Sequence, residues 1–212
     1  MVLRRSVLLG ALTALLPASA WAAEPVSPLA LKAFALIDGL DVEHNWPAGV
    51  HVNWRTGVPD GRPEKLEGKH THCSAFAAAA AESLGIYLLR PPDHGQMLLA
   101  NAQYDWLLSQ GAAQGWQPIR TMAQAQDAAN QGMFAVAVYH NRNDDRPGHI
   151  AIIRPGAKSP QQLAAEGPDV TQAGGTNYRS ASLKQGFAGH PRAWKNQEFL
   201  LFAHAIDAKD LN

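Results

Sequence analysis

The sequence is poor in cysteine, in charge and in long apolar runs, and each shortage excludes a class of protein. Its 212 residues include one cysteine, Cys73, so no disulfide can form within the chain. Lysine plus arginine equals aspartate plus glutamate, at 18 each, which excludes the basic surface typical of nucleic-acid-binding proteins. Charged residues make up 17% and hydrophobic residues 46%, a composition of a globular domain with a substantial core rather than of a disordered chain or coiled coil.

The first 22 residues predict a secretory signal peptide. A basic start at Arg4 and Arg5 precedes an apolar run over 7–16, and a small-residue cleavage pattern follows it. This run is too short to span a membrane, and the paired arginines leave both the general and the twin-arginine export routes open. We therefore expect a leader over 1–22, one catalytic domain over 23–212, and a periplasmic or secreted protein with no membrane span after cleavage.

The segment HCSAFAAAAAESLGI places the lone cysteine at the start of an apolar run with helical spacing. An exported protein with one cysteine carries either a free thiol or an intermolecular bridge. The unpaired N–H groups and partial positive charge of a helix N-terminus favour a thiolate and can also hold an oxyanion. We predict that Cys73 is a nucleophile with a lowered pKa; the alternative is a buried structural cysteine.

Helical and strand-like periodicities divide the rest of the chain into two halves. Helical patterns come first, interrupted by a long irregular loop over 41–69, and alternating or continuous apolar runs come after them. This order predicts an α+β fold in which N-terminal helices pack on an antiparallel sheet. The expected helices cover 27–39, 73–85, 95–111 and 121–132, and the expected strands cover 133–139, 149–154, 169–173 and 198–206.

A thiol nucleophile needs a base, and the base needs a group that orients it. His149 begins the apolar segment HIAII directly after a Pro-Gly turn, which suits a base held rigidly at the edge of a cleft. Gln172, in DVTQAGG, lies on a strand that can run beside that of His149 and place an amide against the imidazole. Asn177 is the alternative third residue, and His140 is the alternative base.

These segments resemble the NlpC-type cell-wall cysteine peptidases of the papain-like superfamily over about residues 50–207. The family's Cys-Ser helix, Gly-His strand and third polar residue are matched by CSAFAAAAAESLGIYLLRPPDHGQ, GHIAIIRPG and TQAGG. The resemblance implies a papain-like fold with Cys73 as nucleophile, His149 as base and Gln172 as orienting group. It also implies an amidase that cleaves peptidoglycan stem peptides through an acyl-enzyme, without a cofactor. Peptidoglycan or its peptide fragments would be the partner, with a possible protein inhibitor or targeting partner.

Departures from the family pattern concern the substrate more than the chemistry. His72 and Ala75 stand where the family commonly has Asp and Gly, and QGMFAVAV replaces its Pro-Gly-Asp turn. Trp54 is a loose match to a family tyrosine that shapes the acyl site. We expect Trp54, His72, Ser74 and Asn177 to contact substrate.

Three alternatives remain open at this stage. The segment KHTHC could supply zinc ligands from His70, His72 and Cys73, but its spacing is not that of a zinc site, and we expect no metal. Trp46 is a further candidate for ligand contact, whereas Trp106 is expected in the core. The same residues would also suit a thiol acyltransferase or lipid-acting enzyme, or a cell-wall binding module that has lost catalysis.

Overall fold

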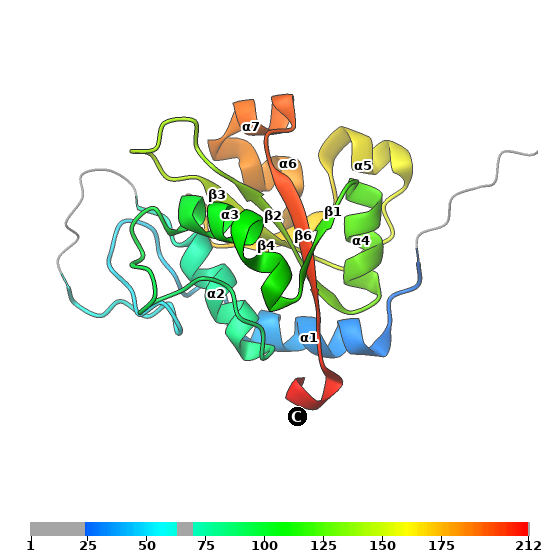
Figure 1. Cartoon of the computed structure of the whole chain (residues 1–212), viewed down its shortest axis with the longest axis horizontal. Helices are drawn as coiled ribbons and strands as arrows, with labels where there is room; N and C mark the ends of the chain where they lie inside the picture. The colour runs from blue at the N-terminus through cyan, green and yellow to red at the C-terminus, as the bar shows by residue number, and fades with distance from the viewer. Residues whose placement is uncertain (1–23, 63–69, 212) are drawn as a thin grey trace, which may run out of the picture.

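A six-stranded antiparallel sheet in the order β1-β6-β2-β3-β4-β5 forms the centre of the fold (Figure 1). This computed structural model describes residues 24–62 and 70–211, so the predicted signal peptide lies outside the described residues. The strands are β1 (Trp116–Ile119), β2 (Met133–Tyr139), β3 (His149–Ile153), β4 (Asp169–Gln172), β5 (Tyr178–Ser182) and β6 (Leu200–Ala205).

Side chains alternate along the central strands and build a core on each face of the sheet. On β2, Phe134, Val136 and Val138 belong to one buried cluster, while Ala135 and Ala137 belong to the other. Because successive strand residues point to opposite faces, a continuous apolar strand must be covered on both sides. The α+β class with an antiparallel sheet is therefore confirmed, and the sheet is a middle layer.

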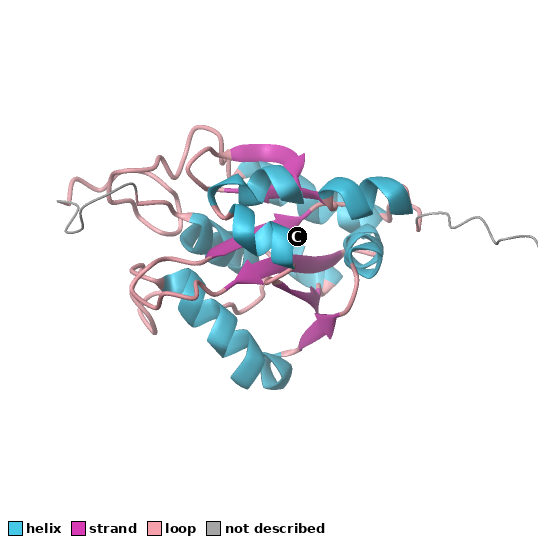
Figure 2. Cartoon of the chain, turned by 90° about the horizontal axis from the view of Figure 1, so that it is seen from above, coloured by secondary structure: helices cyan, strands magenta, loops and turns pink. Residues whose placement is uncertain are grey.

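Helices cover both faces of this sheet (Figure 2). The cluster with Phe134 is closed by α1, α2 and α3, and the cluster with Ala135 by α4, α6 and α7. None of the helices within 24–62 and 70–211 has the length and apolar character needed to cross a membrane. The helices are α1 (Pro28–Gly39), α2 (Cys73–Ser83), α3 (Leu99–Ser109), α4 (Met122–Asn130), α5 (Pro160–Glu166), α6 (Leu183–Gly186) and α7 (Pro191–Asn196), with 3-10 turns η1 (Gly111–Gln114), η2 (Phe187–Gly189) and η3 (Ala208–Leu211).

The four predicted helices and four predicted strands are all present, with differences at their ends. The helix expected over 95–111 begins only at Leu99, because Leu98 has a left-handed backbone with φ 54°. Ser27 and Thr121 cap α1 and α4, since their hydroxyls accept N–H bonds in the first turns of these helices. Two strands, β1 and β5, and three α-helices, α5, α6 and α7, were not predicted.

Helix α2 is buried on every side because its residues are small. Alanines fill almost the whole helix, and each of the nine residues from Cys73 to Ala81 is buried. Such a surface lets the helix lie close to β3 and β4. Gln103 of α3 fixes its start by donating from Nε2 to the Ser74 carbonyl at 3.0 Å and the Leu89 carbonyl at 2.9 Å.

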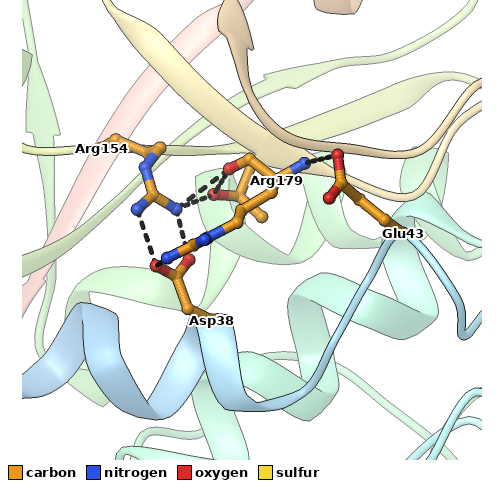
Figure 3. Close-up of polar contacts among 5 residues, drawn as sticks. Asp38, Glu43, Arg154 and Arg179 are labelled. Atoms are coloured by element: carbon orange, nitrogen blue, oxygen red, sulfur yellow. Dashed lines mark hydrogen bonds and ion pairs between the residues drawn. The ribbon is translucent and has the colours of Figure 1, made fainter.

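An ion-pair cluster ties α1 to the strands that carry the candidate site (Figure 3). Arg154 forms a two-pronged bond to Asp38 at 2.6 and 3.0 Å and also donates to Thr171 Oγ1 at 2.7 Å. Arg179 donates to Asp38 at 2.8 Å, and its own N–H reaches Glu43 at 3.4 Å. Since Thr171 directly precedes Gln172, the cluster helps to fix the end of β4.

Asp38→Asn is expected to lower the free energy of unfolding by about 3 kcal/mol at pH 7, since it leaves a half-buried arginine without its counter-charge. Burial alone would raise the pKa of Asp38, but the bonds from Arg154 and Arg179 outweigh it and lower this pKa. The carboxylate's stabilisation is therefore fully present above its unfolded-state pKa and is lost as pH falls through the lower folded-state pKa. Urea unfolding at several pH values measures the difference.

Asp41→Asn is the matched control for this variant. Its carboxylate pairs with the exposed His44, and asparagine tolerates the positive φ of 54° at this position. We expect a change within about 0.5 kcal/mol. Equal losses for the two variants would contradict the role given to the cluster.

Candidate active site

Cys73 is the first residue of α2, and its sulfur lies against the start of β3. The N–H groups of Ile150 and Ser74, the Cys73 N–H and the Thr71 hydroxyl lie close enough to the sulfur to favour its thiolate form. The predicted helix start is thus confirmed, and the thiol lies beside the residue that follows His149.

The predicted low pKa of this thiol is wrong. Cys73 is only 3% exposed, and burial raises the pKa of its thiol above the ordinary value. The hydrogen bonds from Ile150, Ser74, Thr71 and the Cys73 N–H act in the opposite direction but do not outweigh the loss of hydration. The resting thiol is therefore protonated at neutral pH, and a nearby base must remove its proton during any attack.

His149 begins β3 and is held there by a close backbone approach. The residue before it must be glycine, because a Cβ at Gly148 would collide with the Tyr139 carbonyl oxygen and come within 2.5 Å of Asn101 Oδ1. Asn101 in turn donates to the Arg146 carbonyl at 2.9 Å and so holds the turn that enters β3. The Gly-His step in the sequence thus has a steric origin.

Gln172, the last residue of β4, lies against His149 as the sequence predicted. His149 Nε2 is 2.7 Å from Gln172 Oε1, and both side chains are buried. The Gln172 amide nitrogen points to the Thr176 carbonyl at 3.5 Å, which identifies Oε1 as the acceptor and Nε2 of His149 as the protonated nitrogen. His149 Nδ1 is then the nitrogen left to accept a proton.

Two glycines leave room for the Gln172 amide. A Cβ at Gly186 would lie 2.7 Å from its oxygen, and one at Gly174 would lie 2.8 Å from its nitrogen. Any larger residue at either position would move the amide. The orientation of His149 therefore depends on α6 as well as on β4.

His149 is a neutral imidazole at physiological pH. Burial lowers its pKa to about 4, and the Gln172 hydrogen bond opposes this only in part. A neutral imidazole that reaches a neutral thiol acts as a general base, and the proton then moves as the sulfur attacks.

An aromatic shell surrounds the base. The Phe187 ring meets the His149 ring at 4.9 Å between centroids and 84° between planes. His190 stacks on it at 5.5 Å and 27°, and Tyr139 contacts His190 at 5.4 Å. Sequence reasoning missed both His190 and Phe187, because a single histidine or phenylalanine in an unassigned segment carries no periodic or motif signal.

The residues predicted to contact substrate divide into buried and accessible ones. His72 is buried and its Nε2–H donates to the Val50 carbonyl at 2.8 Å, so it is not the polar edge of a cleft. Ser74 is buried as well. Trp46 is fully buried, which contradicts its role in ligand contact, whereas Trp54 is half-buried under the Arg55 guanidinium at 4.7 Å.

The two alternative catalytic residues are engaged elsewhere. Asn177 donates from Nδ2 to the carbonyls of Val42 and Asn45 at 2.8 Å each, and so anchors a loop. His140 lies 3.4 Å from Asp105 and packs edge-on against Tyr104. Gln172 and His149 are therefore the better candidates for orienting group and base.

Ranges 24–62 and 70–211 contain no cluster of three or more histidine, cysteine or acidic side chains able to hold a metal ion. His70 and His72 flank Thr71 in the sequence, and His72 is committed to Val50. The KHTHC segment thus lacks a third suitably placed ligand among these residues.

Gln172→Ala is expected to lower kcat by about 10- to 1000-fold. Without the amide oxygen, neither the Nε2–H tautomer of His149 nor the orientation of its ring is fixed. A neutral amide stabilises an imidazolium less than a carboxylate does, so the loss should be smaller than for the nucleophile. Steady-state kinetics on the folded variant measures it.

Asn177→Ala serves as the comparison. It removes loop anchors and should reduce stability while keeping kcat near the wild-type value. If Asn177→Ala loses most of its kcat while Gln172→Ala keeps the wild-type kcat, then Asn177 rather than Gln172 is the third catalytic residue.

No protein-family model matches the chain, and no curated protein matches it. Function must therefore be argued from the geometry of the site.

Proposed function

We propose that the protein is an exported thiol amidohydrolase that cleaves amide bonds in peptidoglycan stem peptides. The observation that carries the proposal is the 2.7 Å bond between His149 and Gln172 at the start of the strand that contacts the Cys73 sulfur. A thiol at the start of α2, close to Ile150, and a His–Gln pair on the adjacent strands β3 and β4 supply the three kinds of group that a cysteine hydrolase needs. A papain-like fold and the peptidoglycan substrate, both suggested by the family resemblance, are parts of this proposal.

The reaction begins with a proton transfer from the thiol. The Cys73 sulfur attacks the amide carbonyl carbon while its proton passes to His149 Nδ1. This transfer requires that Nδ1 come within hydrogen-bond distance of the sulfur at the start of β3. Negative charge develops on the carbonyl oxygen, where N–H groups at the start of α2 can stabilise it. The carbon–nitrogen bond then breaks, and His149 returns the proton to the departing amine.

Water completes the cycle by hydrolysing the thioester. His149 accepts a proton from the attacking water, the new oxygen–carbon bond forms, and the carbon–sulfur bond breaks to release a carboxylic acid. The proton then returns to sulfur and restores the neutral pair. Gln172 keeps its bond to Nε2–H throughout, so that Nδ1 is the nitrogen that exchanges protons.

Incubation with purified peptidoglycan sacculi, followed by mass analysis of released fragments, tests the proposal. New free amines at one defined amide bond are expected with the wild-type protein, and none with Cys73→Ala in the same preparation. Binding to sacculi without fragment release would support the non-catalytic binding module instead.

A thiol acyltransferase or lipid-acting enzyme is the second candidate. Exposed apolar side chains on the segments linked to His72 favour it: Val50 is 41% exposed, and its carbonyl accepts a hydrogen bond from His72, the neighbour of Cys73. Met97 is 59% exposed and follows Gln96, whose amide donates to the Val52 carbonyl at 2.9 Å. Acyl transfer to an added amine or alcohol in preference to water, measured by product ratio, would select this candidate.

A further inference from the structure

A second imidazole lies directly on the candidate base. The His190 and His149 rings are stacked with 5.5 Å between centroids and 27° between planes, and the Phe187 ring meets the same imidazole nearly at right angles. His190 is the N-cap residue of α7, so its place is set by a separate element from those carrying the triad. The base is therefore held by ring contacts as well as by Gln172.

His190 is the member of this group that faces water. His149 and Gln172 are 4% and 3% exposed, whereas His190 is half-buried. Water competes strongly for a polar hydrogen bond that it can reach, and a dry bond is stronger electrostatically. Removing the His190 ring would open a face of His149 and give water access to its bond with Gln172.

The charge around His190 also suits this role. His149 from β3 and Tyr139 from β2 face its ring, η2 contributes the uncharged Phe187, and on its own helix Arg192 pairs with Glu198 at 3.9 Å. Burial and repulsion by His149 lower the pKa of His190 to about 4, so it is neutral at neutral pH. Two neutral rings can stack without repulsion, whereas two protonated rings repel each other.

We propose that His190 is a positioning residue of the active site: its neutral ring covers one face of His149 and keeps the His149–Gln172 bond dry. His190 neither touches substrate nor exchanges protons with the thiol. The contribution of His190 to catalysis rests on the proposed function. Its protection of the His149–Gln172 bond from water is independent of that function.

Proton NMR of the His149 Nε2–H tests the inference without any substrate. His190→Asn removes the ring but keeps a good N-cap residue, and His190→Phe restores a ring that cannot titrate. We expect a slowly exchanging imidazole N–H in the wild-type protein and in His190→Phe, and exchange about tenfold faster or more in His190→Asn. His140→Phe is the matched control, because His140 is another half-buried imidazole packed on a tyrosine. In this variant the His149 N–H should exchange as slowly as in the wild-type protein.

Three outcomes would overturn the inference. They are wild-type exchange in folded His190→Asn, failure of His190→Phe to restore slow exchange, and an equal acceleration in His140→Phe. Each would mean that the His190 ring does not specifically protect the base.

Kinetics then separates positioning from stability. His190→Asn should lower kcat by about tenfold with KM unchanged, and His190→Phe should stay within about threefold of the wild-type kcat at pH 7. A rise in KM with unchanged kcat would overturn the positioning role. If no variant, including the wild type, turns over an amide substrate while the NMR result holds, the proposed function fails and the structural role of His190 stands.

Discussion

Cys73→Ala is expected to abolish the proposed amide cleavage while the protein stays folded. The variant removes the only atom that can form the acyl-enzyme, so kcat should fall by about 10⁵- to 10⁶-fold, as for the loss of a nucleophile in other triads. The side chain it replaces is small, and unfolding free energy should change by about 1 kcal/mol. Fragment release from sacculi and thermal unfolding measure the two effects.

Cys73→Ser and Ser83→Ala complete this experiment. Serine keeps a hydrogen-bonding group at the helix start but is a much weaker nucleophile beside a base with a pKa of about 4, so it too should be inactive. Ser83, at the far end of the same helix, should be dispensable. Full activity in Cys73→Ala would move catalysis to another site.

The second large effect is expected for His149→Ala, and its size should depend on pH. At pH 7 the thiol is protonated because burial raises its pKa, so loss of the base should lower kcat by about 10⁴-fold or more. As pH rises toward the pKa of the thiol, hydroxide can generate the thiolate without His149. The deficit of the variant should therefore shrink between pH 7 and pH 10.

The acid side of the wild-type profile follows from the same imidazole. His149 acts as a base only while neutral, and its pKa is lowered to about 4 by burial. Activity should thus persist at pH 5 and fall as pH approaches 4. A pH-independent deficit in His149→Ala would contradict the neutral-pair mechanism, and a comparable loss in His140→Ala would contradict the choice of base.

Sequence periodicity was sufficient for the elements that are long, apolar and well capped. The alternating strand 133–139 and the helix begun by Ser27 and Pro28 have patterns that few other structures satisfy. Strand β1 was missed because it is four residues long and contains Pro118, and β5 because YRSAS offers little apolar alternation. Helices α5 to α7 are each seven residues or fewer, which is too short for a clear helical period.

The positions of the site residues could be predicted from sequence motifs. Properties that depend on burial, such as the thiol pKa, could not. The pairing of His149 with Gln172 follows from adjacent strands, and the position of Cys73 follows from the helix start. The direction of the thiol pKa shift could not be predicted, because desolvation arises from residues distant in sequence that close over the helix N-terminus. The ring of His190 is close to His149 only through the packing of η2 and α7 on the sheet.

Gly148, Gly174 and Gly186 suggest how distant relatives of this protein could be found. Each is fixed by a side chain or carbonyl that leaves no space for a Cβ, and together they surround the His149–Gln172 pair. Positions without such contacts, on outer helix faces and elsewhere in loops, are under no such steric restriction and can vary while these three glycines stay constant. A search profile weighted on Gly-His, Gln-x-Gly and the later glycine should therefore find distant relatives more sensitively than one based on average similarity.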